Sequence, residues 1–160
     1  MKRVLVVASV VSAVLAVGGA RAYFTAQTEV KDNVISAGSV AMSVEPTSAA
    51  LSINPIAPGE TVIRTVDITN TGALACDVAT SAAKKAGYTD FWNALACRVT
   101  HEGTEVYAGA LATMRTTPIR IAPGQKTTLR YSLSLPAEAG NDLQGDYVRA
   151  SLYVDAEQVR

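Results

Sequence analysis

The stretch TLRYSLSL at residues 128–135 places leucine or tyrosine at every second position, with arginine or serine between them. This period of two is typical of a β-strand with one buried face, because successive side chains of a strand point to opposite sides. The same alternation recurs in three other segments: residues 39–44, 65–69 and 148–155. Strands with one apolar face need a second layer against which to bury it. The pattern therefore predicts an all-β fold, a sandwich of two antiparallel sheets.

Two near-identical turn sequences punctuate these strands, IAPGE at residues 56–60 and IAPGQ at residues 121–125. Proline presets the φ of the second residue in a type II turn, and glycine tolerates the positive φ of the third. Two copies are too few to stack as a solenoid. We therefore expect the two turns at equivalent edges of one sandwich.

The region between the two cysteines departs from strand character. Thr89 is a candidate N-cap, and the residues after it space their apolar side chains for one or two helical turns. Residues 81–87 are compatible with either helix or loop. We expect a short helical excursion near residues 82–95.

The first 22 residues have the three parts of a secretory signal: a basic start at Lys2 and Arg3, an apolar run, and small residues at Ala20 and Ala22. The alternative is a membrane anchor, but a spanning helix needs about 20 apolar residues and this run ends earlier, at a double glycine. We predict that a signal peptidase cleaves after Ala22. The mature chain then begins at Tyr23, and the protein contacts the membrane only before cleavage.

The 14 basic and 14 acidic residues of the chain balance, but they are distributed unevenly. Residues 1–22 hold three basic residues and no acidic one, so the remainder carries a formal charge of −3 (11 basic minus 14 acidic). A mildly acidic body without a basic stripe argues against a nucleic-acid-binding protein.

Cys76 and Cys97 are the two cysteines of the chain. An even number of cysteines in an exported protein favours a disulfide, and the alternative is two buried free thiols. We predict the Cys76–Cys97 disulfide. Two cysteines without neighbouring histidines supply too few ligands for a metal.

The sequence shows no catalytic, metal-binding or cofactor-binding constellation. His101 is the single histidine, and a zinc-peptidase helix needs a second histidine four residues later, where this chain has Glu105. Gly103 also breaks a helix there, so we place His101 at a hairpin tip. Neither a G-x-S-x-G nucleophile elbow nor a phosphate-binding glycine loop is present. We therefore predict a protein that is not an enzyme and needs no cofactor.

Several segments in collinear order carry a resemblance to a known family. They are AYFT at 22–25, NVISAGSV at 33–40, IAPGE at 56–60 with TNTG at 69–72, residues 91–111, and LQGD at 143–146 before a strand ending DAEQ at 155–158. The ordered set is similar to the TasA/camelysin family. The chain departs from the family pattern at Ala26, where an aspartate is usual, and at Ala41-Met42, where Asp-Leu is frequent. The cysteine pair is not a family hallmark.

The resemblance implies a jelly-roll-like sandwich that a monoderm bacterium exports to its extracellular matrix or cell surface. Family members build biofilm-matrix fibres in which the segment after the cleavage site is donated as a strand to the next subunit. Mapped onto this chain, the donor lies within Tyr23 to Val30 and is anchored by Tyr23 and Phe24, with Thr25 next to them. Some camelysin relatives carry a metallopeptidase label.

The residues themselves agree with strand donation. Residues 23–30 favour β-structure and hold a single charge, at Glu29, and residues 31–33 provide a hinge. An extended segment adds to a sheet edge through main-chain hydrogen bonds. The alternative is that this segment pairs within its own sandwich. The predicted organisation is thus a signal peptide at 1–22, a donor segment with its hinge at 23–33, and a sandwich domain at 34–160.

These expectations define a leading function and its alternatives. We expect a secreted structural subunit of matrix fibres, whose partner is a second copy of itself, head to tail, or a related fibre subunit. A head-to-tail contact propagates as a filament, since it does not close on itself. The alternatives are a monomeric accessory or anchoring module of such fibres, and a camelysin-like metallopeptidase.

Overall fold

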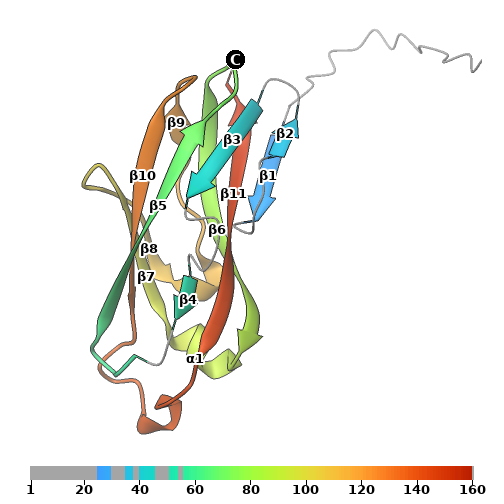
Figure 1. Ribbon diagram of the computed structural model, residues 1–160. Helices are drawn as coiled ribbons and strands as arrows, with labels where there is room; N and C mark the ends of the chain where they lie inside the picture. Colours follow the sequence, from blue (N-terminus) through green and yellow to red (C-terminus); the bar gives the residue numbers. More distant parts are fainter. Residues whose placement is uncertain (1–24, 30–34, 38–39, 46–50, 54–55, 160) are drawn as a thin grey trace, which may run out of the picture.

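Antiparallel pairing of β-strands determines the architecture of the computed structural model (Figure 1). The structure describes residues 25–29, 35–37, 40–45, 51–53 and 56–159. The predicted signal peptide, with Ala20 and Ala22, lies outside the described residues, as do Tyr23, Phe24 and Val30. No helix in the described part of the chain is long and apolar enough to cross a membrane.

One sheet contains six of the described strands. Their spatial order is β2 (Ile35–Ala37), β3 (Val40–Glu45), β5 (Thr61–Asn70), β10 (Lys126–Ser134), β7 (Ala96–His101) and β8 (Thr104–Ala110). The long central pair, β5 and β10, is in register from Thr61 opposite Ser134 to Thr69 opposite Lys126.

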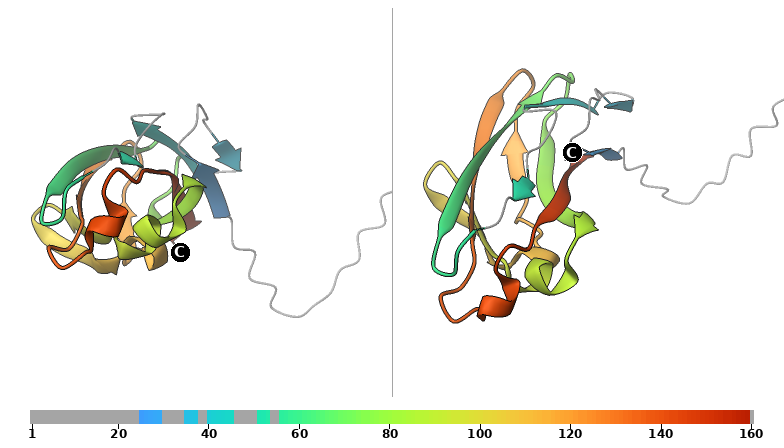
Figure 2. Two further views of the ribbon diagram at one scale, coloured as in Figure 1. Left: turned by 90° about the horizontal axis from the view of Figure 1, so that it is seen from below. Right: turned by 60° about the horizontal axis from the view of Figure 1, so that its bottom comes forward.

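The second sheet contains five of the described strands. Four of them follow the order β1 (Thr25–Glu29), β11 (Val148–Gln158), β6 (Cys76–Gly87) and β9 (Ile119–Ile121), and β4 (Leu51–Ile53) also pairs with β11. Figures 1 and 2 show β1 at one side of the sandwich, beyond β11.

The core lies between the two sheets, as the alternation in the sequence predicted. Along β10 every second residue from Thr127 to Leu133 is buried, and β11 buries Leu152, Val154 and Ala156 against it. Across this core, the buried Tyr131 hydroxyl donates to Thr80 Oγ1 at 2.9 Å. The two-sheet antiparallel sandwich is therefore confirmed.

A single short α-helix, α1 (Thr89–Ala94), interrupts the described strands, and it lies where a helical excursion was expected. Tyr88 occupies the N-cap position without a side-chain cap, and Thr89 is the first helical residue instead of the cap. The helix is held by burial of Phe91 and Trp92. Residues 82–87 continue β6, because β11 offers a backbone partner to all of them except Lys85, where the register shifts. Two 3-10 turns, η1 (Leu111–Thr113) and η2 (Asn141–Leu143), complete the elements.

The two proline-glycine turns occupy equivalent positions at opposite ends of the β5–β10 pair. Gly59 has φ of 84° and Gly124 has φ of 72°, as the third residue of a type II turn requires. The residue after each glycine also returns a side-chain oxygen to the turn: Glu60 Oε2 accepts from Ala57 N at 2.9 Å, and Gln125 Oε1 accepts from Ala122 N at 3.0 Å. The near-copies in the sequence thus mark a local two-fold symmetry of this strand pair.

Asn70, at the end of β5, ties the two sheets together although it is fully buried. Its Nδ2 donates to the carbonyls of Leu74 (2.8 Å) and Ile121 (3.0 Å), and its Oδ1 accepts from Gly72 N (3.0 Å). An amide is suited to this position because it offers two donors and an acceptor at once.

The predicted Cys76–Cys97 disulfide is wrong, because both cysteines are buried free thiols. Cys97 on β7 lies opposite Leu133, which lies opposite Val62 near the start of β5. Cys76 lies opposite Ile121, whose carbonyl is bound by Asn70 at the other end of β5. The eight residue-to-residue steps from Val62 to Asn70 span about 26 Å of strand, whereas a disulfide needs Cα atoms within about 7 Å.

Replacing Asn70 with alanine should lower the free energy of unfolding by about 3 kcal/mol, because it removes three hydrogen bonds, one of them to the buried carbonyl of Ile121. Urea unfolding measures this change. Asn93→Ala, an exposed position within α1, is the matched control and should stay within about 0.5 kcal/mol of the parent. Equal losses in the two variants would contradict the role of Asn70.

The free thiols predict a loss of stability in alkali. Burial raises the pKa of the Cys97 thiol from its ordinary value of 9.0 to about 12. Since the unfolded chain releases this proton at lower pH than the folded chain, stability falls between about pH 9 and 12. Burial also raises the pKa values of Cys76 and Tyr131, which adds to the loss.

Urea unfolding at pH 8, 9 and 10 measures this dependence. Removing the Cys97 thiol with Cys97→Ala should reduce the slope above pH 9 by up to about 1.4 kcal/mol per pH unit. The slope of stability against pH reports the proton release alone, because a packing loss shifts the whole stability curve without changing its slope. Parallel curves for parent and variant would show that Cys97 does not hold its proton in the folded chain.

Candidate strand-acceptor site

The outer edge of β11 is the place where the N-terminal strand meets the sandwich. On its inner side β11 pairs with β6 along its whole length, from Val148 to Gln158. On its other side, β4 covers residues 148–150 and β1 covers residues 153–157. Two short strands therefore cover one long edge.

The described part of the predicted donor, residues 25–29, pairs with β11 of its own chain. The register runs from Thr25 opposite Glu157 to Glu29 opposite Tyr153. In the single chain, the N-terminal strand thus completes its own sandwich, which is the alternative that the sequence left open. Donation to a neighbour would use the same edge with the strand of another copy.

The β11 residues opposite β1 alternate between the core and the outer face of the sheet. Val154 and Ala156 are fully buried behind the strand. On the outer face, Asp155 Oδ2 is bound by Arg115 Nη1 at 3.0 Å, and Glu157 is exposed. The Tyr153 hydroxyl accepts from Lys85 Nζ at 2.6 Å, and the same Nζ lies 5.2 Å from the centre of the tyrosine ring. This edge therefore has an apolar floor, meaning the buried side chains of Val154 and Ala156. On its outer face it has charged side chains of both signs.

The edge of the six-stranded sheet at β8 is guarded in a different way. A bulge between Val99 and Thr100 of β7 shifts the pairing near Val106. The carbonyl of Val106 accepts from Thr117 N at 3.0 Å, and the carbonyl of Ala110 accepts from the Tyr107 hydroxyl at 2.6 Å. Bulges and occupied carbonyls blunt a sheet edge against pairing with another chain.

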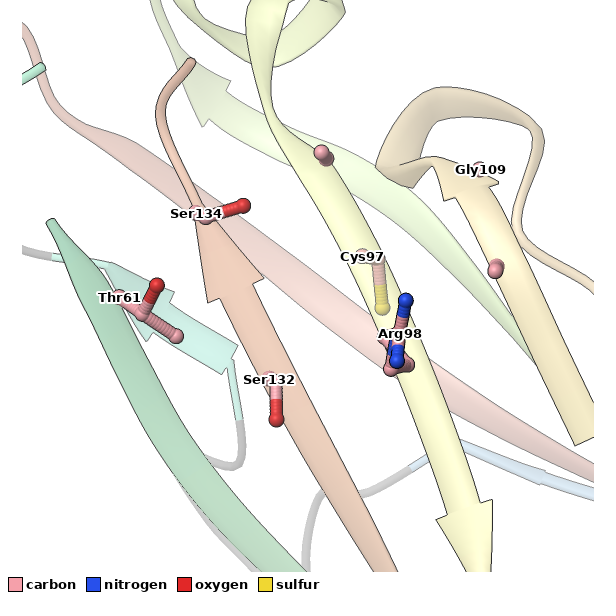
Figure 3. A pocket seen from close by; sticks show the side chains of 8 residues that line it. Thr61, Cys97, Arg98, Gly109, Ser132 and Ser134 are labelled. Atoms are coloured by element: carbon pink, nitrogen blue, oxygen red, sulfur yellow. The ribbon is translucent and has the colours of Figure 1, made fainter. Parts of the chain in front are cut away.

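A shallow depression of about 350 Å³ lies on the outer face of the six-stranded sheet (Figure 3). Its lining consists of small side chains, together with Cys97 and Arg98: Thr61, Ala96, Ala108, Gly109, Ser132 and Ser134. Neither histidine nor carboxylate lines it, and Arg98 is paired with Glu105 at 3.2 Å. With the Cys97 thiol protonated at neutral pH, the depression offers no activated nucleophile.

His101 occupies the end of β7, beside the turn to β8, as the sequence predicted. Glu102 and Gly103 form this turn, both with positive φ (49° and 82°). The His101 Nε2 atom is hydrogen-bonded to Thr127 Oγ1 at 2.6 Å. Within the ranges that the structure describes, no three histidine, cysteine, aspartate or glutamate side chains gather around a common point. The described residues thus do not fit the three protein ligands that a catalytic zinc uses.

Comparison with known proteins supports the resemblance found in the sequence. The family model of the camelysin metallo-endopeptidases matches residues 2–87, more than half of the chain. The chain belongs to the camelysin family. This family, which includes TasA, is typically secreted or surface-associated. A search of curated proteins found no relative that matches.

In this camelysin-family chain, the sequence analysis named Thr25 as part of an N-terminal strand but did not name the β11 residues opposite that strand. The alternation at 148–155 already separates Tyr153 and Asp155 from the buried face. Lys85 could not be placed, because residues 81–87 carried no strand pattern. The match also includes residues 2–24 and thus the predicted signal, whose cleavage after Ala22 stays a prediction.

Proposed function

We propose that this camelysin-family chain is a secreted, non-enzymatic structural subunit that polymerises head to tail into biofilm-matrix fibres. In the fibre, residues 23–30 of one copy occupy the β11 edge of the next. The observation that carries the proposal is the pairing of β1 with β11, because a short terminal strand covers an edge backed by buried side chains.

Exchange of such a strand costs little energy, because the same backbone hydrogen bonds form within a chain or between chains. The hinge predicted at residues 31–33 lets the segment leave its own sandwich. Head-to-tail donation leaves each subunit with one donated strand and one filled edge, so growth continues. The guarded β8 edge does not compete for the incoming strand.

Removing the donor tests the proposal. We expect the chain from Tyr23 to Arg160 to form filaments and the chain from Asp32 to Arg160 to form none, as imaged by negative-stain electron microscopy. Filaments that persist without residues 23–31 would contradict strand donation, and failure of both chains to assemble would contradict the structural role.

A locked variant provides the matched control without shortening the chain. Thr25→Cys with Glu157→Cys places two cysteines at directly paired positions, within disulfide reach. When the monomer is oxidised first, β1 is tied to its own β11 and filaments should not form, whereas reduction should restore them. The parent chain treated in the same way controls for Cys76 and Cys97.

Two other functions can be distinguished from the fibre-subunit role by experiment. An accessory module would stay monomeric alone and enter fibres made by a related subunit, so co-sedimentation with such fibres detects it. A metallopeptidase, which the description of the family names, would cleave casein in a chelator-sensitive manner. We expect no cleavage, and activity that disappears in His101→Ala would contradict the non-enzymatic assignment.

A further inference from the structure

Some interaction must fix the register in which a strand pairs with the β11 edge. A slip of one residue would exchange the buried and outer faces of the strand, so the apolar floor opposes it. A slip of two residues keeps the faces and is not opposed in this way. Residues 25–28 are uncharged and small or of medium size, so their side chains discriminate weakly between one register and another. Glu29 is the charged residue of β1.

Tyr153, the residue opposite Glu29, is contacted by a lysine that lies at a bulge of the next strand, β6. The pairing of β11 with β6 shifts between Arg149, opposite Ala86, and Ala150, opposite Lys84. Lys85 is therefore the extra residue of a β-bulge, a feature that re-aims a side chain. Its Nζ lies against Tyr153, both at the hydroxyl and over the ring, and Tyr153 is the partner of Glu29.

The neighbouring positions carry the opposite sign. Asp155, which forms an ion pair with Arg115, lies opposite the uncharged Gln27, and the exposed Glu157 lies opposite the uncharged Thr25. If the strand slipped by two residues in one direction, Glu29 would lie opposite Asp155 and Gln27 opposite Glu157. Like charges directly opposite each other destabilise a strand pair, whereas opposite charges stabilise it.

We propose that Lys85, held over Tyr153 by the β6 bulge, is the specificity-determining residue of the β11 edge and selects a strand that presents an acidic residue opposite Tyr153. The selection acts on the chain's own β1 and, where the proposed fibre forms, on the strand of the neighbouring copy. It deepens the proposed function by naming what the acceptor edge recognises. Surface charge pairs are screened by salt, so the selection weakens as ionic strength rises.

Cross-linking at two registers tests this inference in the chain from Tyr23 to Arg160. The pair Thr25→Cys with Glu157→Cys reports the observed register, and the pair Gln27→Cys with Glu157→Cys reports the slip of two residues. In the parent background the first pair should cross-link faster. Charge reversals are then added to both pairs, and the ratio of the two rates is measured at low and high salt.

Glu29→Lys should lower the ratio of observed to slipped register by about threefold or more, because the new lysine is repelled by Lys85 and attracted by Asp155. Lys85→Glu should lower the cross-linking rate of the observed register, and Lys85→Gln should lower it less. Combining Glu29→Lys with Lys85→Glu should restore the parent preference. Arg130→Glu, the same charge change on the outer face of the other sheet, is the matched control and should change nothing.

Single reversals without effect would overturn the inference, and so would a double reversal that fails to restore the register. An Arg130→Glu effect equal to that of Lys85→Glu would also overturn it, since net charge alone would then be responsible. The inference and the fibre proposal fail separately. Cross-links that stay within single chains in every sample contradict strand donation, while the register ratios are still read from those same cross-links.

Discussion

The outer edge of β11 is the constraint on which the molecule depends. A strand edge presents a row of unpaired N–H and C=O groups, and here that row is backed by side chains with no exposure to solvent, Val154 and Ala156. The edge must therefore be covered. In the single chain, β1 and β4 cover it together, and both come from the N-terminal third of the sequence. The proposed fibre satisfies the same requirement with a strand from another copy.

The remaining architecture is consistent with one exchangeable edge. At β8, the other side of the sandwich, a bulge and bonded carbonyls discourage pairing. Between the sheets, Asn70 and the Tyr131–Thr80 hydrogen bond hold the core independently of β1. The proposed release of the first strand would leave the centre closed, since the residues that make these bonds lie on β5, β6, β9 and β10. Lys85 then gives the exposed edge a preference for one register.

Much of this could be predicted from the sequence where the signal was periodic. The alternation at 128–135 and 148–155 predicted β10 and β11. The two proline-glycine turns predicted equivalent edges of one sandwich, and the structure places them at the two ends of the β5–β10 pair. Other features depend on which strands become neighbours. The cysteine pair suggested a disulfide by its even number, but strand order places the thiols at opposite ends of β5. Residues 82–87 show no alternation, and it is the partner strand β11 that makes them a strand and turns Lys85 into a bulge residue.

Strand donation is tested most directly by placing the two cysteines on different copies. One population carries Thr25→Cys alone and the other Glu157→Cys alone, and the two are mixed before assembly and oxidised afterwards. The account predicts that filaments yield a covalent dimer of one copy of each kind on a non-reducing gel, while oxidised monomers yield none. Filaments that form without this mixed dimer would contradict it, because β1 would then remain on its own β11.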